Sequence, residues 1–109
     1  MKISEYADFQ EAVLSFQPLD KEFISVRHEL DPTEEIRPHY HPKATEWIIV
    51  CEGTFDVQIG DEALTFYSVS PGEFLVIEIP KKEPHTFYAQ KKTKYHVYRE
   101  RKDRIIYCK

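Results

Sequence analysis

Residues 39–59 read HYHPKATEWIIVCEGTFDVQI, and residues 54–59 within this stretch alternate between polar and apolar in the way that β-strands do. His39 and His41 are two residues apart, so a strand would direct both imidazoles to one face. Pro42 to Thr45 is typical of a connection, and the apolar run after Glu46 predicts a returning strand. Such a return would bring the Glu46 carboxylate opposite the two histidines.

Short segments with the same alternation fill most of the chain and are separated by turn residues. The expected strands cover residues 24–30, 37–41, 46–51, 54–59, 63–68, 73–79, 85–90 and 94–99, with a further piece at 104–107. The turn expected between the third and fourth of these is Glu52-Gly53. Many short strands at this spacing indicate an all-β sandwich or closed barrel, not alternating β-α units.

One amphipathic helix is expected before the strands, because apolar residues recur there every three or four positions. These residues are Ile3, Tyr6, Phe9, Val13 and Phe16, with Ser4 as a candidate N-cap and Gln17-Pro18 as the end. We therefore expect an N-terminal helical segment over residues 1–20 and a β-barrel domain over residues 21–109. The chain as a whole would form a single domain.

The size and hydropathy of the chain narrow its class. Its 109 residues, 41% of them hydrophobic, fit one globular domain with one core. No segment approaches the ~18 uninterrupted apolar residues of a membrane-spanning helix. The first ten residues also lack the apolar run of a secretory signal. We therefore expect a cytoplasmic protein that does not contact a membrane.

The formal charge of −4 is unevenly distributed along the chain. Residues 1–90 carry a net −10, whereas residues 91–109 carry +6. The basic tail is interrupted at strand-like spacing by apolar residues such as Tyr95 and Val97. Because the whole chain is acidic and would repel a polyanion, we do not expect it to bind nucleic acid.

The histidines and Glu46 are candidate metal ligands. A fourth candidate, His85, follows the Pro-bounded turn at residues 80–84. Three imidazole nitrogens and one carboxylate oxygen suit a divalent transition-metal ion, and an octahedral ion would keep two positions for water, oxygen or substrate. The ligand set does not distinguish iron, manganese, nickel, zinc, copper and cobalt. Histidines without a metal would be the alternative, and we expect that role for His28 and His96.

Two further side chains are candidates for contact with a substrate. Arg37 shares strand parity with His39 and His41, so its guanidinium could sit at the rim and hold a carboxylate or phosphate. A solvated arginine is the alternative. Tyr88 is the second candidate, and Tyr88 also joins Glu78 and His96 as a possible acid or base near the ion.

These residues resemble the two motifs of the cupin superfamily. The first motif, two histidines separated by one residue, a glutamate and a glycine, is matched by His39, His41, Glu46 and Gly53. The second resembles Gly72-Glu73, Pro80 and Pro84-His85. The chain has no glycine near Thr33 or in Pro80-Lys81-Lys82, where cupins usually carry one. The resemblance implies a cupin-type double-stranded β-helix, or jelly-roll, with one metal ion held inside by His39, His41, Glu46 and His85.

Cupins include dioxygenases, sugar and sugar-phosphate isomerases, decarboxylases and non-catalytic binding modules. We expect a metal-dependent cupin that acts on a small polar molecule inside the barrel, as a dioxygenase-type oxidoreductase. A sugar or sugar-phosphate isomerase and a non-catalytic small-ligand binding or regulatory module are the alternatives. We also expect a homodimer, because Trp47, Ile49 and Cys51 have the parity opposite to Glu46 and the N-terminal helix offers another apolar face.

Overall fold

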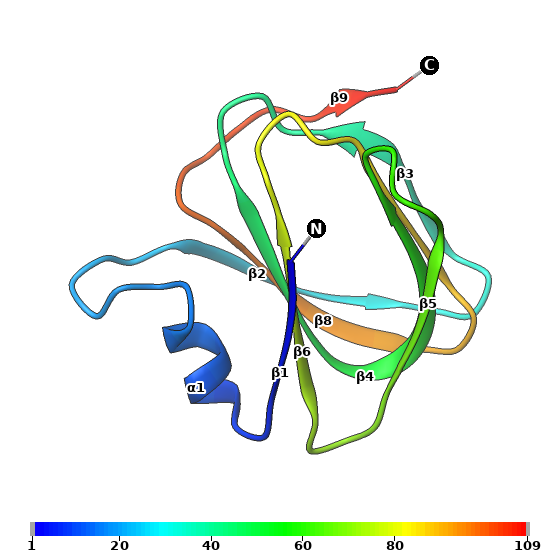
Figure 1. Cartoon of the computed structure of the whole chain (residues 1–109), viewed down its shortest axis with the longest axis horizontal. Coiled ribbons are helices and arrows are strands. Elements are labelled where there is room, and N and C mark those ends of the chain that lie inside the picture. The colour runs from blue at the N-terminus through cyan, green and yellow to red at the C-terminus, as the bar shows by residue number, and fades with distance from the viewer. Residues whose placement is uncertain (1, 109) are drawn as a thin grey trace.

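A computed structural model describes residues 2–108, which form nine strands and one short helix (Figure 1). The elements are β1 (Lys2–Tyr6), α1 (Phe9–Leu14), β2 (Ile24–Leu30), β3 (Glu35–Tyr40), β4 (Glu46–Ile59), β5 (Thr65–Val69), β6 (Phe74–Ile79), β7 (His85–Ala89), β8 (Thr93–Arg99) and β9 (Ile106–Tyr107). The all-β class is confirmed. No helix within residues 2–108 is long and apolar enough to span a membrane.

The strands form two antiparallel sheets that share β4. One sheet has the order β1-β6-β4-β8-β2, and the other has the order β5-β4-β7-β3-β9. The sheets curve into a barrel that does not close, since β2 pairs only with β8 and β9 pairs only with β3. Figure 1 shows β9 beside β3 at the rim.

Strand β4 is one continuous strand of 14 residues, so the turn predicted at Glu52-Gly53 is wrong. A register shift between Val50 and Glu52 replaces the turn. It moves the inward-facing positions from Glu46, Ile48 and Val50 to Phe55, Val57 and Ile59, so that each half of the strand faces the same core. The shift lets one strand serve both sheets.

The helix predicted to begin near Ser4 is wrong for the first residues of the chain. Residues 2–6 form β1, which pairs with β6. The helix α1 begins only after Asp8, whose carboxylate accepts a 2.7 Å hydrogen bond from the Gln10 N–H. In a strand, residues three apart face opposite sides, and Ile3 accordingly packs on the core between the sheets while Tyr6 packs outside it.

The helix covers the outer face of the sheet that contains β4 and β6. Ala12 is fully buried there against Ile49 and Val76, and Phe16 stacks on Trp47 with ring centroids 5.2 Å apart. The two apolar faces that suggested a homodimer therefore cover each other within one chain. The homodimer stays a prediction, but these two apolar faces no longer support it.

Candidate metal centre

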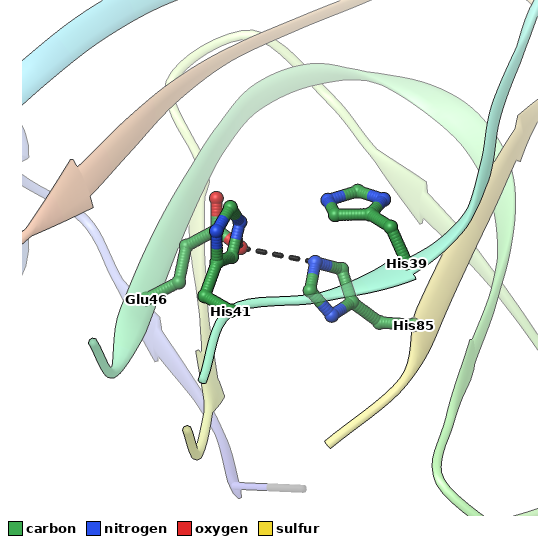
Figure 2. Close-up of side chains that lie close together, drawn as sticks. All are labelled: His39, His41, Glu46 and His85. Atoms are coloured by element: carbon green, nitrogen blue, oxygen red, sulfur yellow. Dashed lines mark ion pairs between the residues drawn. The ribbon is translucent and has the colours of Figure 1, made fainter. Parts of the chain in front are cut away.

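Three strands bring His39, His41, Glu46 and His85 together (Figure 2). His39 lies in β3, and His41 directly follows that strand. Glu46 opens β4 and His85 opens β7, where His85 is the register partner of His39. All four side chains are buried, with 2 to 7% of their surface exposed, and their ligand atoms lie within 4.8 Å of one another.

Each imidazole is held by a backbone carbonyl through its Nδ1 atom. His39 Nδ1 lies 2.8 Å from the Arg37 carbonyl oxygen, and His85 Nδ1 lies 3.0 Å from that of Glu83. His41 Nδ1 lies 3.1 Å from the carbonyl oxygen of Arg104. A carbonyl oxygen only accepts, so Nδ1 carries the proton in each ring and Nε2 is free as a metal ligand.

The free nitrogens face the Glu46 carboxylate at short range. Glu46 Oε2 lies 3.0 Å from His85 Nε2 and 3.5 Å from His41 Nε2. These three atoms are fully buried and have no aligned hydrogen bond. Buried acceptors that face one another without a proton are costly, and a cation placed between them would remove that cost. This arrangement fits a metal ion.

The pKa shifts agree with a ligand set that is ready to bind a cation. Burial lowers the pKa values of His39 and His41, which favours their neutral form. Burial alone would raise the pKa of Glu46, but its neighbours His85, His41 and Arg99 outweigh burial and lower it. His39 and His41 therefore offer neutral imidazoles, and Glu46 offers an ionised carboxylate, at neutral pH.

The four ligand atoms would have to move only slightly toward one another to bind one ion. Two ligands on opposite sides of an ion with bonds of about 2.1 Å are about 4.2 Å apart. The 4.8 Å spread of the four ligand atoms is slightly larger. A movement of less than about 1 Å would bring all four onto one ion. Four protein ligands would still leave octahedral positions open.

The ligands lie at one end of a cavity of about 300 Å³ between the sheets. His39, Glu46 and His85 belong to its lining. Its apolar walls come from Leu30, Ile36, Ile48, Phe87, Val97 and Ile105. A cavity of this size beside the candidate ligands is large enough for a small molecule.

Neither predicted substrate contact lines this cavity. A bulge between Ile36 and His39 breaks the parity of β3, so Ile36 lines the cavity instead of Arg37. Arg37 is exposed, and its guanidinium carbon lies 4.6 Å from the centre of the Tyr107 ring. Tyr88 is 37% exposed and follows Phe87, which faces inward, so Tyr88 lies on the outer face.

The other candidate acids and bases also lie away from the cavity. Glu78 accepts a 3.0 Å hydrogen bond from the Trp47 indole N–H, and His96 packs against Phe9 of the helix. Sequence reasoning missed Arg99, which lines the cavity with its Nε atom 3.6 Å from Glu46 Oε1. Its parity with Tyr95 and Val97 was the signal that could have identified it.

Comparison with known proteins identifies the family. A model of the cupin domain matches residues 26–98, about two-thirds of the chain. The chain belongs to the cupin family. No curated protein matches it by sequence.

Several solved structures share the fold of this cupin. One is the capsular polysaccharide assembling protein CapF from Staphylococcus aureus (TM-score 0.63, 16% identity, 75% of this chain and 24% of that chain). Another is oxalate oxidase in complex with the substrate analogue glycolate (TM-score 0.62, 24% identity, 76% and 44%). KdgF from Halomonas sp. also matches (TM-score 0.61, 17% identity, 73% and 71%). The cupin spans about a quarter of CapF and less than half of that oxalate oxidase, and these identities show a shared fold alone.

The two turns where this cupin lacks the usual glycine keep a glycine-like backbone. Thr33 has a φ of 74° and Lys82 has a φ of 70°, the left-handed region that glycine adopts without cost. Hydrogen bonds hold both turns. The Thr33 N–H donates to the Ala89 carbonyl oxygen at 2.9 Å, and the Lys82 N–H donates to that of His41 at 2.8 Å. Both turns therefore hold a backbone conformation that glycine would adopt more easily.

Proposed function

We propose that this cupin binds one divalent transition-metal ion through His39, His41, Glu46 and His85, and acts as a dioxygenase-type oxidoreductase on a small polar molecule in the cavity. One observation carries the proposal. Four buried acceptor groups face one another, with His41 Nε2, His85 Nε2 and Glu46 Oε2 unpartnered, beside a cavity of about 300 Å³. The site contains the two histidines and one carboxylate that, with open positions, are typical of non-haem iron oxygenases, and it adds a third histidine.

The residues of the chain have separate tasks in this proposal. The backbone carbonyls fix the ring orientation of the three histidines, and Glu46 balances part of the charge of the ion. The apolar walls exclude bulk water from the reacting molecule. A bound ion of this kind supplies Lewis acidity and, when it is iron or manganese, a redox couple. Both atoms of O₂ would enter the substrate, so the reaction needs no external reductant.

The surroundings of the site favour this chemistry over proton transfer by an isomerase. Glu78, Tyr88 and His96 do not line the cavity. Tyr95 does, but burial, with smaller effects of Glu46 and Glu34, raises its pKa to about 12, so it stays protonated. One observation supports the isomerase as a second candidate. His28 lines the cavity, stacked on Tyr95 with ring centroids 5.4 Å apart, and could serve as a base.

The relatives give limited support for a small oxygen-rich substrate. The similar oxalate oxidase was solved with glycolate, an analogue of its own substrate. We propose that the substrate of this chain is likewise a small oxygen-rich molecule.

We also propose that the protein is a cytoplasmic homodimer, and light scattering would detect the dimer as twice the chain mass of 13.0 kDa.

Metal content is the first test of the proposal. Protein purified without chelator should hold close to one transition-metal ion per chain. His41→Ala and Glu46→Ala should abolish this stoichiometry because each removes a ligand. His96→Ala is the matched control and should keep the ion, since His96 packs on the helix. A wild-type protein that stays metal-free after reconstitution with iron, manganese, nickel or zinc would reject the site.

Oxygen uptake separates the three functions. The iron-loaded protein should consume O₂ in the presence of one of a panel of small hydroxy acids, keto acids and polyols. Conversion without O₂ uptake that is lost in His28→Gln would identify an isomerase instead. Ligand binding without conversion of any compound would favour the binding module.

A further inference from the structure

We propose that the cavity binds the carboxylate group of a small organic anion, and that Arg99 is the side chain that holds it beside the metal centre. This inference rests on the metal site of the proposed function and specifies the class of its ligand. It depends on the position of Arg99, on the charge of the cavity and on its volume.

Arg99 is placed where a ligand next to the ion would meet it. It is the last residue of β8, where its register partner on β4 is Glu46, and it lines the cavity. Its Nε atom is buried, lacks a hydrogen bond and lies 3.6 Å from Glu46 Oε1. The side chain is 23% exposed, so part of it remains open to a ligand.

The hydrogen-bonding capacity of Arg99 is largely unused. A guanidinium carries five N–H donors in a planar fork, and among residues 2–108 Arg99 makes only the long contact with Glu46. A carboxylate accepts two parallel hydrogen bonds from such a fork, whereas a hydroxyl group cannot. A carboxylate therefore matches this donor better than a neutral polyol does.

The charge of the loaded site also favours an anion. Glu46 and Arg99 carry opposite charges that offset each other, and a histidine that binds a metal ion does so in its neutral form. Glu29 at the cavity edge is neutralised by Lys92, whose Nζ lies 3.5 Å from Glu29 Oε2. A divalent ion would then give the site a net positive charge. Apolar walls strengthen its attraction for an anion.

The volume limits the size of the ligand. About 300 Å³ corresponds to roughly ten water molecules at ~30 Å³ each. The fitting compounds are small mono- and dicarboxylates, with the carboxylate at Arg99 and the rest of the molecule against the apolar walls. Arg99 could instead serve only as a counter-ion that orients Glu46, and the experiment below separates these roles.

The test uses zinc-loaded protein, because zinc has no redox chemistry that would consume the ligand. Isothermal titration compares malonate with malonamide, its neutral analogue of similar shape. Wild-type protein should bind malonate at least tenfold more tightly than malonamide. Arg99→Met should weaken malonate binding by roughly 10- to 100-fold, the loss expected for a hydrogen-bonded ion pair, and leave malonamide binding unchanged. Arg101→Met removes the same charge from an exposed position nearby and should change neither affinity.

Zinc content is measured for every variant, so that the two proposals can fail separately. A wild-type protein that takes up none of zinc, iron, manganese and nickel rejects the metal site and therefore the proposed function. If Arg99→Met retains zinc and binds malonate as tightly as the wild type, only the ligand role of Arg99 is rejected. The same conclusion follows if the wild-type protein does not prefer malonate to malonamide. If Arg99→Met loses zinc, Arg99→Lys keeps the charge but not the fork. The Arg99→Lys variant should hold zinc and bind malonate several-fold more weakly than the wild type does. A malonate affinity equal to that of the wild type would overturn the proposal.

Discussion

Thr33 is an exposed, β-branched residue with a φ of 74°, and this conformation costs it roughly 1 to 2 kcal/mol. We predict that Thr33→Gly raises the free energy of unfolding by about 0.5 to 1 kcal/mol, because relief of the strain exceeds the entropy that glycine loses on folding. Urea denaturation would measure the change. Thr33→Ala keeps a Cβ atom and should gain less. A lower midpoint for Thr33→Gly than for the wild type would show that the turn is not strained.

Tyr95 contributes a stabilisation of the folded protein that is lost at alkaline pH. Burial is the main reason that its pKa rises from the ordinary value of 10.0 to about 12. A raised pKa favours the protonated phenol in the folded state, so this stability is present below pH 10 and is lost as pH rises from 10 towards 12. We predict that between about pH 8 and pH 11 the wild type loses about 1.4 kcal/mol more unfolding free energy than Tyr95→Phe. Denaturant titrations at the two pH values test this, and parallel losses would contradict it.

The side chains of the candidate site differ in how well sequence predicts them. His39, His41, Glu46 and His85 follow from strand parity and turn positions, and the structure brings them together. Arg37 was expected at the rim by the same parity, but the bulge before His39 turns it outward. A one-residue bulge changes the facing of a side chain without leaving a mark in the hydrophobic pattern. The parity of Arg99 with Tyr95 and Val97 indicates that it faces inward, but its contact with Glu46 joins strands distant in sequence, and periodicity does not predict that contact.

At the scale of elements, Gly53 makes the continuous strand β4 possible. It has a φ of 138°, and a Cβ atom there would lie 2.6 Å from the Thr93 Cα atom. We predict that Gly53→Ala destabilises the protein by roughly 2 to 4 kcal/mol, because backbone strain and overlap with a neighbouring backbone add. Gly72→Ala is the matched control. Gly72 has a φ of 91° but nothing within 4 Å of the added Cβ, so its cost should be limited to roughly 1 to 2 kcal/mol of strain.

Thermal unfolding followed by circular dichroism would measure both glycine variants. Equal losses would mean that the close approach of Gly53 to β8 contributes nothing. The same residue explains one limit of the sequence analysis. Gly53 was interpreted as part of a turn, because a glycine after a charged residue usually marks one, whereas here it serves close packing inside a strand.

The N-terminal elements show why local periodicity was insufficient to predict where the helix begins. Apolar spacing at Phe9 and Val13 correctly indicated a helix that packs by one face, but the helix ends at Leu14, and Phe16 packs on the same cluster from the turn that follows. Ile3 and Tyr6 fit the same spacing but belong to β1, because β6 offers backbone partners for residues 2–6. Pairing with a strand about 70 residues away is a tertiary effect, and it decided the local structure.

At the scale of the whole molecule, the four candidate ligands connect the two sheets at one end of the open barrel. Glu46 lies in the part of β4 that pairs with β6 and β8, whereas His39 and His85 lie in the β3–β7 pair of the other sheet. An ion bound by all four would therefore link the sheets where no backbone pairing between β2 and β9 closes the barrel. The unfolded chain would not hold the ion in this geometry, so binding should stabilise the fold.

We predict that removal of the ion by a chelator lowers the Tm and that excess metal restores it. An ion present at about 100 times its dissociation constant adds about 2.7 kcal/mol of stability. For a domain of this size, that corresponds to a shift of roughly 10 °C or more. His41→Ala and Glu46→Ala should melt at the same temperature with and without metal, whereas His96→Ala should show the full shift. If the wild-type Tm is the same with metal and with chelator, in protein shown to bind the ion, the unfolded chain must hold the ion as tightly as the folded site does, which would contradict the prediction.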